Sequence, residues 1–382
     1  MLALALGGFG IGTTEFVTMG LLPDIARAFD ISEPSAGHAV SAYALGVVVG
    51  APLIAALCAR VPRKKLLIVL MAAFTVGNAA TVLAPTFGTL VAARFVSGLP
   101  HGAYFGVASL AAATLAPVGQ RAKAVAAVML GLSVANVLGV PGATWLGQHL
   151  GWRNAYVVVA VIGVATVAAL WRYVPDLTSM KISNPMTELG ALRRPQVLLT
   201  LAVGAIGFGG MFAVYTYIAT TMTDVAGMSI GAVPIVLALF GLGMIVGNIG
   251  GGILADRGVD RSIFVAMIAM VVILAGFVLA AHNPITAALG AFLVGASGAA
   301  LAPGLQTRLM DVAADAQTLA AALNHAALNI ANAAGAWLGG LVIAAGLGYT
   351  APAMVGAMLA VLGVALFTVT VWTARRAAPN TP

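Results

Sequence analysis

The sequence predicts an all-α integral membrane fold, with twelve transmembrane helices in two pseudo-symmetric six-helix bundles and both termini in the cytoplasm. Three observations lead to this fold class. Of the 382 residues, 61% are hydrophobic and only 8% are charged, whereas an ordinary soluble domain carries roughly a quarter charged residues. Apolar stretches of about 20 residues, enough to cross a hydrocarbon core of roughly 30 Å, follow one another along the chain. Finally, the second stretch is repeated in the eighth.

These stretches use nearly the whole length of the chain, so no soluble domain is expected. Predicted spans one to six form a first bundle, residues 1–171, and spans seven to twelve form a second, residues 197–382 with a short tail. Between them, residues 172–196 contain three prolines and several charges, which is typical of a cytoplasmic linker. The predicted spans are residues 2–22, 36–58, 66–84, 87–108, 124–146, 154–171, 197–219, 232–254, 263–281, 285–306, 318–344 and 351–373.

A shift of 197 positions superposes the second span on the eighth. Gly46 then falls on Gly243, and Gly50 falls on Gly247. The match continues into the same basic turn after each span, which shared hydrophobicity alone does not explain, so it indicates two duplicated halves. Glycines spaced by four permit close helix approach. They are expected either to support sliding of helices or to pack them statically.

The basic residues indicate the topology. Of the 18 Lys and Arg residues, 15 follow even-numbered spans or lie in the C-terminal tail. Connections rich in Lys and Arg stay in the cytoplasm, which places both termini inside and predicts a multi-pass protein of the cell membrane. The net charge of +7 therefore reflects topology and implies no nucleic acid. The expected partners are a small-molecule substrate, protons and the lipid bilayer. The chain is expected to be a monomer.

Glu15 is the one acidic residue within a predicted span, and Arg94 is the one basic residue. Charges in hydrocarbon are costly and usually serve ion or proton traffic. Each lies about seven residues, roughly 10 Å, from the outer end of its span, so they could be partners. We hypothesise that Arg94 favours the Glu15 carboxylate when they are close, and that separation or substrate binding lets Glu15 take a proton. A static ion pair is the alternative. His101 is a third candidate for proton coupling, or a packing residue.

Candidate substrate-binding residues lie on spans one, four, five, seven and eleven. Small and adaptable residues flank Glu15, aromatic and methionine residues share one face of span seven, and uncharged polar residues follow span eleven. Helix packing and interhelical hydrogen bonds explain the same patterns about as well. The substrate-binding set is Gly12, Glu15, Met19, His101, Asn136, Phe208, Met211, Phe212, Tyr215, His325 and Asn329. Under the 197 shift Glu15 falls on Phe212, so proton handling should reside in the first half.

The sequence lacks the phosphate-binding loop of ATPases and the common motifs of hydrolases and metalloproteases. ATP is therefore excluded as the direct energy source, and neither enzymatic activity nor a bound metal is expected. No cofactor is expected either, and a proton gradient remains as the energy source.

The stretch from Gly252 to Arg261, GILADRGVDR, resembles the cytoplasmic signature of the major facilitator superfamily. Its copy from residue 55 to 64, AALCARVPRK, departs from the signature at Ala59, where the family has Asp. The segment from Asn136 to Gly142, NVLGVPG, is similar to the antiporter motif of span five, with a valine inserted; its proline frees a backbone carbonyl and favours a bend. These resemblances imply a gating set of Arg60, Arg63, Gly139, Pro141, Gly142, Asp256, Arg257 and Arg261.

Two further stretches resemble one branch of that superfamily, the twelve-span drug:proton antiporters such as the chloramphenicol exporters and arabinose-efflux-like permeases. They are GTTEF at residues 12–16, followed by GLLPDIA at 20–26, and RFVSGLPHGAYFG at 94–106. The resemblance implies proton-coupled efflux of small, partly apolar compounds, such as chloramphenicol or a related metabolite, by alternating access. It also implies that Arg94 takes part in proton coupling. A proton-independent facilitator or importer of a sugar, nucleoside or other small metabolite is the alternative.

Overall fold

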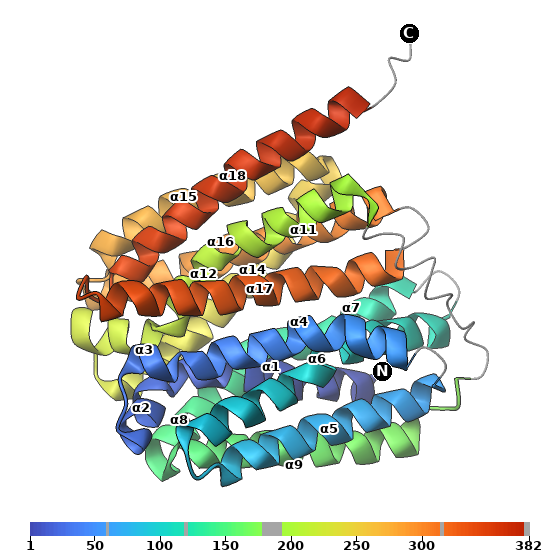
Figure 1. Cartoon of the computed structure of the whole chain (residues 1–382), viewed down its shortest axis with the longest axis horizontal. Coiled ribbons are helices and arrows are strands. Elements are labelled where there is room, and N and C mark those ends of the chain that lie inside the picture. The colour runs from blue at the N-terminus through green and yellow to red at the C-terminus, as the bar shows by residue number, and fades with distance from the viewer. Residues whose placement is uncertain (59–60, 118–120, 178–192, 314–316, 378–382) are drawn as a thin grey trace.

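The structure is a computed structural model that describes residues 1–58, 61–117, 121–177, 193–313 and 317–377. Its described residues form two groups of long helices, one from each half of the chain (Figure 1). The first half contains α1 (Leu2–Gly20), α2 (Leu22–Phe29), α3 (Glu33–Ala36), α4 (His38–Leu57), α5 (Arg63–Leu83), α6 (Phe87–Leu115), α7 (Arg121–Val134), the π-helix η1 (Ala135–Gly139), α8 (Val140–Leu150) and α9 (Trp152–Tyr173). The second half contains α11 (Pro195–Gly207), α12 (Gly209–Thr216), α13 (Ile218–Thr220), η3 (Thr221–Val225), η4 (Ile230–Ala232), α14 (Val233–Arg257), α15 (Val259–Ala280), α16 (Pro284–Ala313), α17 (Gln317–Ala344) and α18 (Ala351–Ala377).

Twelve membrane-length helices or helix runs occur in the described residues, in the predicted order. Eleven of them are long and apolar enough to cross a bilayer by composition alone. The twelfth is α6, whose 29 residues include the polar side chains of Arg94 and His101 and the internal Pro100. These lower its apolar character, although α6 packs among the spans against α4 and α5. The predicted all-helical, twelve-span fold is confirmed.

The molecule has a linker end and a far end. The linker end holds the N-terminus, the ends of α9 and α18 and the beginning of α11; the far end holds α2, α3 and the turn between α17 and α18 (Figure 1). Most of the predicted linker, residues 178–192, lies outside the described residues, as does Arg60.

Local signals place the helix ends at the far end. The Ser32 hydroxyl accepts a hydrogen bond from the Ser35 amide and begins α3, and Thr86 and Thr89 form a capping box that begins α6. Such caps satisfy amide groups that have no partner within the helix. Asp30 ends α2 with φ of 53°, a left-handed backbone that Asp tolerates better than most residues. Through these turns the chain leaves α1, reverses direction and re-enters the bundle as α4.

The repeat seen in the sequence reappears in the packing. A Cβ added to Gly46 would lie 2.2 Å from the Phe95 carbonyl oxygen, and one added to Gly243 would lie 2.0 Å from that of Phe292. Both members of the second pair are shifted by 197 residues from the first. The same offset relates the contact of Gly50 with Leu99 to that of Gly247 with Ala296. The pairs α4–α6 and α14–α16 are therefore duplicated units in which two backbones touch.

The two halves share a hydrophobic core at the far end. One cluster of buried side chains contains Phe16, Leu22 and Val40 of the first half together with Phe212 and much of the second half. A separate cluster, built around Leu67 and Phe74 and extending toward the linker end, contains first-half residues only. Within the described ranges, the hydrogen bonds that join the halves are Ser41 Oγ to the Ala333 oxygen, at 3.2 Å, and Thr220 Oγ1 to Glu33 Oε2. The halves are thus tied together at the far end.

Candidate functional site

Glu15 lies on α1 at the boundary between the two halves. Its side chain is 6% exposed, and the described residues provide it with no hydrogen-bond or ion-pair partner. The ring of the next residue, Phe16, stacks on Phe212 of α12 with centroids 6.3 Å apart and meets Tyr215 edge-on at 5.7 Å. The carboxyl group of Glu15 lies near the hydroxyl groups of Tyr43 and Tyr215. The single acid of the predicted spans is therefore buried and unpaired.

Arg94 is fully buried on α6 and reaches α1, but it binds Thr14 rather than Glu15. Its two terminal nitrogens donate to the Thr14 hydroxyl and to the Thr14 carbonyl oxygen, each at 2.9 Å. No ion pair among the described residues joins Arg94 to Glu15. The guanidinium also lies over the Tyr43 ring at 4.4 Å and the Tyr156 ring at 5.4 Å. Aromatic faces stabilise a cation that has lost its water.

A layer of rings connects the halves farther toward the linker end. The Tyr43 hydroxyl lies 3.1 Å from Nδ1 of His101. Phe105, one turn along α6, stacks almost flat on His325 of α17, with centroids 5.6 Å apart, and His101 is 6.4 Å from the same imidazole. His101 and His325, predicted as separate candidates, are therefore brought together across the boundary.

Aromatic side chains of the second half pack next to α1. Tyr215 stacks on Phe240 of α14 with centroids 3.9 Å apart, and Phe208 packs on Phe212 at 5.7 Å. The Tyr215 hydroxyl is buried without a hydrogen-bond partner. Because a buried hydroxyl normally finds a partner, this group is suited to bind a ligand. The predicted aromatic face of span seven is thus placed next to α1.

Asn136 and Asn329 are oriented by their own helices. The amide nitrogen of Asn136 donates to the Leu132 carbonyl at 3.0 Å, and that of Asn329 donates to the His325 carbonyl, also at 3.0 Å. A carbonyl can accept only from the NH₂ group, so the side-chain oxygen of each asparagine must be the free atom. Both oxygens are buried and unpaired. Asn136 lies on the π-helix η1, which ends two residues before Pro141, where the proline was predicted to favour a bend.

Several candidate residues pack helices instead of facing a common space. A Cβ on Gly12 would lie 2.7 Å from Leu132 Cδ1, so Gly12 packs α1 closely against α7. The sulfur of Met211 lies 2.3 Å from the Cβ position of Gly298, which places Met211 within the second half. Gly139 packs on Phe9 and Thr13, and Gly142 has an open Cβ position. Met19 is fully buried in the shared core.

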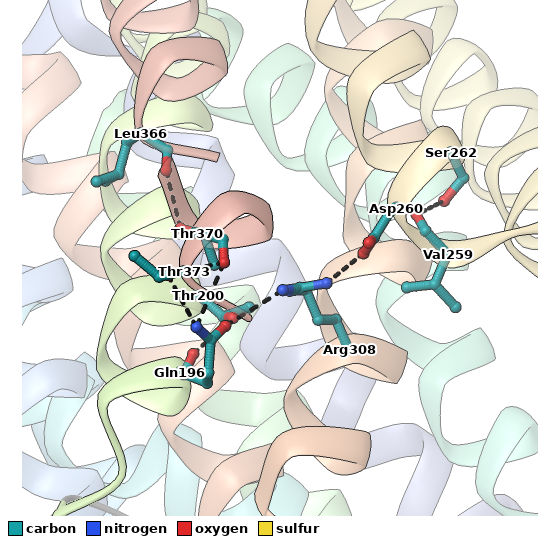
Figure 2. Close-up of polar contacts among 9 residues, drawn as sticks. All are labelled: Gln196, Thr200, Val259, Asp260, Ser262, Arg308, Leu366, Thr370 and Thr373. Carbon is teal, nitrogen blue, oxygen red and sulfur yellow. Dashed lines mark hydrogen bonds and ion pairs between the residues drawn. The ribbon is translucent and has the colours of Figure 1, made fainter. Parts of the chain in front are cut away.

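The basic turn after α14 is tied down by a residue other than the predicted one. Asp256 and Arg257 are exposed, and no described residue forms an ion pair with Asp256. Asp260 instead pairs with Arg308 of α16 (Figure 2). Arg308 also donates to Gln196 of α11 at 3.3 Å, and Gln196 bonds the Thr373 hydroxyl of α18 at 3.0 Å. Four helices of the second half are thereby joined at the linker end. Arg63 begins α5, and Arg261 is exposed on α15.

Sequence reasoning missed residues that complete the site. The Thr14 hydroxyl donates to Asn78 and accepts from Arg94, and the Tyr43 ring covers the guanidinium. Tyr43 could have been found, because the 197 shift that pairs the glycines also pairs Tyr43 with Phe240, and both are aromatic residues at this boundary. Thr14 and Asn78 are common residue types without a distinctive spacing, and only the fold brings them together.

Comparison with known proteins identifies the family. The family model of the Major Facilitator Superfamily matches residues 4–289 and 221–382. The chain is 43% identical to the inner membrane transport protein YdhP of Escherichia coli over 366 residues, 96% of this chain and 94% of that protein. It is 36% identical to a chloramphenicol resistance protein of Streptomyces lividans over 351 residues, 91% of this chain and 88% of the relative.

The fold agrees with this assignment. The crystal structure of a D-xylose–proton symporter superposes with a TM-score of 0.78, covering 96% of each chain at 16% sequence identity. The apolar helices and the relatives together describe a multi-pass protein of the cell membrane that transports a small molecule. The chain belongs to the major facilitator superfamily.

Proposed function

We propose that the chain exports small, partly apolar compounds in exchange for protons, by alternating access of one central site between its two halves. The observation that carries the proposal is Glu15, a carboxyl group buried at the boundary of the halves without a partner. A buried acid with no fixed counter-ion can exist in both protonation states at moderate cost, whereas a salt-bridged one is held as the carboxylate. Glu15 is therefore suited to bind a proton on one side and release it on the other.

The surroundings of Glu15 support a substrate with an aromatic or apolar body and hydrogen-bonding groups. Phe212, Tyr215 and Phe240 offer ring faces from the second half. Asn136 and Asn329 offer free amide oxygens. Flat ligands stack on such rings, and the free oxygens accept hydrogen bonds from them. The chloramphenicol resistance protein of Streptomyces lividans makes chloramphenicol the first compound to test.

We further propose that the linker end faces the cytoplasm. Arg63, Lys64, Arg375 and Arg376 lie at this end, whereas the far end has Arg27 and Arg153. This asymmetry follows the positive-inside rule. In that orientation the shared core and the inter-half hydrogen bonds hold the halves together on the outer side, and an exporter would take up its substrate from the linker end.

Inverted membrane vesicles provide the test. With a proton gradient imposed, wild-type vesicles should accumulate chloramphenicol, and adding it to acidified vesicles should release protons. Glu15→Gln, which keeps the shape and removes the titratable group, should abolish the proton release. Asp176→Asn is the matched control, because Asp176 is an exposed acid whose ion-pair partner among the described residues is Lys64. Full proton-driven accumulation by Glu15→Gln would contradict the mechanism, and accumulation by the wild type without proton flux would identify a facilitator instead.

A further inference from the structure

The contact between Arg94 and α1 is one residue away from the acid. Arg94 binds both the hydroxyl and the carbonyl oxygen of Thr14, and Glu15 follows directly. An α-helix has 3.6 residues per turn, so neighbouring side chains leave it about 100° apart. The guanidinium therefore lies on a different face of α1 from the Glu15 side chain. Two opposite charges stand near each other inside the membrane without forming a pair.

The direction of each hydrogen bond around Thr14 is determined. The amide nitrogen of Asn78 donates to the Phe74 carbonyl at 2.8 Å, which fixes the amide and leaves its oxygen as an acceptor. The Thr14 hydroxyl donates its one proton to that oxygen at 2.5 Å. The Thr14 oxygen is then available only as an acceptor, and it receives Arg94. Thr14, Asn78 and Arg94 are each fully buried, so water does not compete for these positions.

We propose that Thr14 and Asn78 are positioning residues that hold the Arg94 guanidinium off the Glu15 carboxyl and so keep Glu15 able to bind and release a proton. The inference rests on the proposed proton-coupled function. An opposite charge within about 4–6 Å favours the charged form of a carboxyl by roughly 1–3 pH units. If Arg94 were free to pair with Glu15, the carboxylate would persist over most of the working pH range and would take up a proton only in stronger acid.

The two positioning residues can be removed with little change in shape. Thr14→Val deletes the hydroxyl that accepts from Arg94 and leaves only the Thr14 backbone carbonyl of the two acceptors, and Asn78→Leu deletes the group that orients the Thr14 hydroxyl. The control is Thr13→Val, because Thr13 is an equally buried neighbour whose hydroxyl bonds only the Phe9 carbonyl of its own helix, at 2.8 Å. Thr14→Ser keeps the hydroxyl and should restore wild-type behaviour. If the contact only packs helices, the valine variants at positions 13 and 14 should behave alike.

The first readout is the pH profile of substrate-driven proton release. Thr14→Val and Asn78→Leu should move the pH of half-maximal release toward acid by about 1–3 units, while Thr13→Val and Thr14→Ser should coincide with the wild type. A profile for Thr14→Val that matches Thr13→Val would overturn the proposal.

The second readout needs no transport. Dicyclohexylcarbodiimide modifies protonated carboxyl groups in membranes, and mass spectrometry quantifies the modification at Glu15 as a function of pH. At a pH well above the midpoint, Thr14→Val should reduce the extent of labelling about tenfold or more, because each pH unit by which the midpoint falls then lowers the protonated fraction by a factor of about ten. Unchanged labelling refutes the positioning role even if both valine variants transport poorly. Proton release that survives Glu15→Gln refutes the proposed function instead, so the two failures are distinguishable.

Discussion

The hydrogen bond from Thr220 to Glu33 joins the two halves at the far end, and breaking it should open that end. Thr220 is buried on α13, and Glu33 begins α3 in the opposite half. Tyr349, in the turn after α17, faces the same carboxylate; burial and, to a smaller extent, the negative charges of Glu33 and Asp224 raise the pKa of Tyr349 to about 12. Its hydroxyl therefore stays protonated at neutral pH. We call Glu33, Thr220 and Tyr349 the far-end latch.

The size of the effect follows from the chemistry of the bond. A hydrogen bond to a charged group contributes about 1.5–3 kcal/mol. Thr220→Val preserves the branched shape and removes the donor, so the closed arrangement loses that contribution. In the open arrangement Glu33 is solvated in both proteins and loses nothing. Because each 1.4 kcal/mol is a factor of ten in population, the far-end-open fraction should rise roughly 10- to 150-fold.

Cysteine accessibility measures that fraction. In a Cys58→Ser background, Ala333→Cys places a thiol at the buried far-end contact whose carbonyl accepts from Ser41. When opening is faster than alkylation, the maleimide labelling rate is proportional to the open population. Thr223→Val is the matched control, since its hydroxyl bonds the Thr220 carbonyl and Asp224 within its own half. Equal labelling of the two valine variants would refute the latch.

Two further substitutions test the packing of the second half. Gly247→Ala puts a Cβ 2.0 Å from the backbone oxygen of Ala296, which is 1.0 Å closer than the 3.0 Å that real contacts keep. The helices α14 and α16 must then separate, and thermal stability in detergent should fall by about 1–3 kcal/mol. Gly250→Ala is the control, because its Cβ would enter open space on the same helix, and it should not reduce thermal stability. Asp260→Asn leaves the buried Arg308 without its acid, whereas Arg308→Met leaves a half-exposed carboxylate that water can solvate. Asp260→Asn should therefore lower the Tm more than Arg308→Met does. The reverse order would contradict this explanation of the network in Figure 2.

Helix number and order were predictable because bilayer physics constrains them strongly. A span has to be apolar over about 20 residues and has to satisfy its own backbone, and the sequence carries both signals without ambiguity. Even α6, the least apolar span, begins at its predicted residue, Phe87. The duplication was predictable for a similar reason. Where two backbones touch, only glycine fits, so Gly46 and Gly243 record the contacts in the sequence.

The contacts of Arg94 were not predictable in the same way. Counting residues along two spans gives the depth of Glu15 and Arg94, and the two residues do lie at neighbouring helices. Depth does not give the rotation of α1 about its axis, and a difference of one residue moves a side chain by about 100°. Thr14 and Asn78 decide that rotation through two hydrogen bonds. Their partners are 64 and 80 residues away along the chain, and no local spacing records them.

The duplicated halves differ where the chemistry is expected. The 197 shift that superposes their glycines places Phe212 at the position of Glu15, Ala291 at that of Arg94 and Phe240 at that of Tyr43. In the structure Phe212 stacks on Phe16, whose ring also meets Tyr215, and Phe240 stacks on Tyr215. At these three positions the first half therefore has Glu15, Arg94 and Tyr43, and the second half has two phenylalanines and an alanine. The rings of Phe212 and Phe240 and the carboxyl group of Glu15 lie at the boundary between the halves. Any motion that separates the halves therefore changes the environment of the carboxyl group and of a ligand on the rings at the same time. Such a joint change is the physical requirement for coupling proton movement to substrate movement.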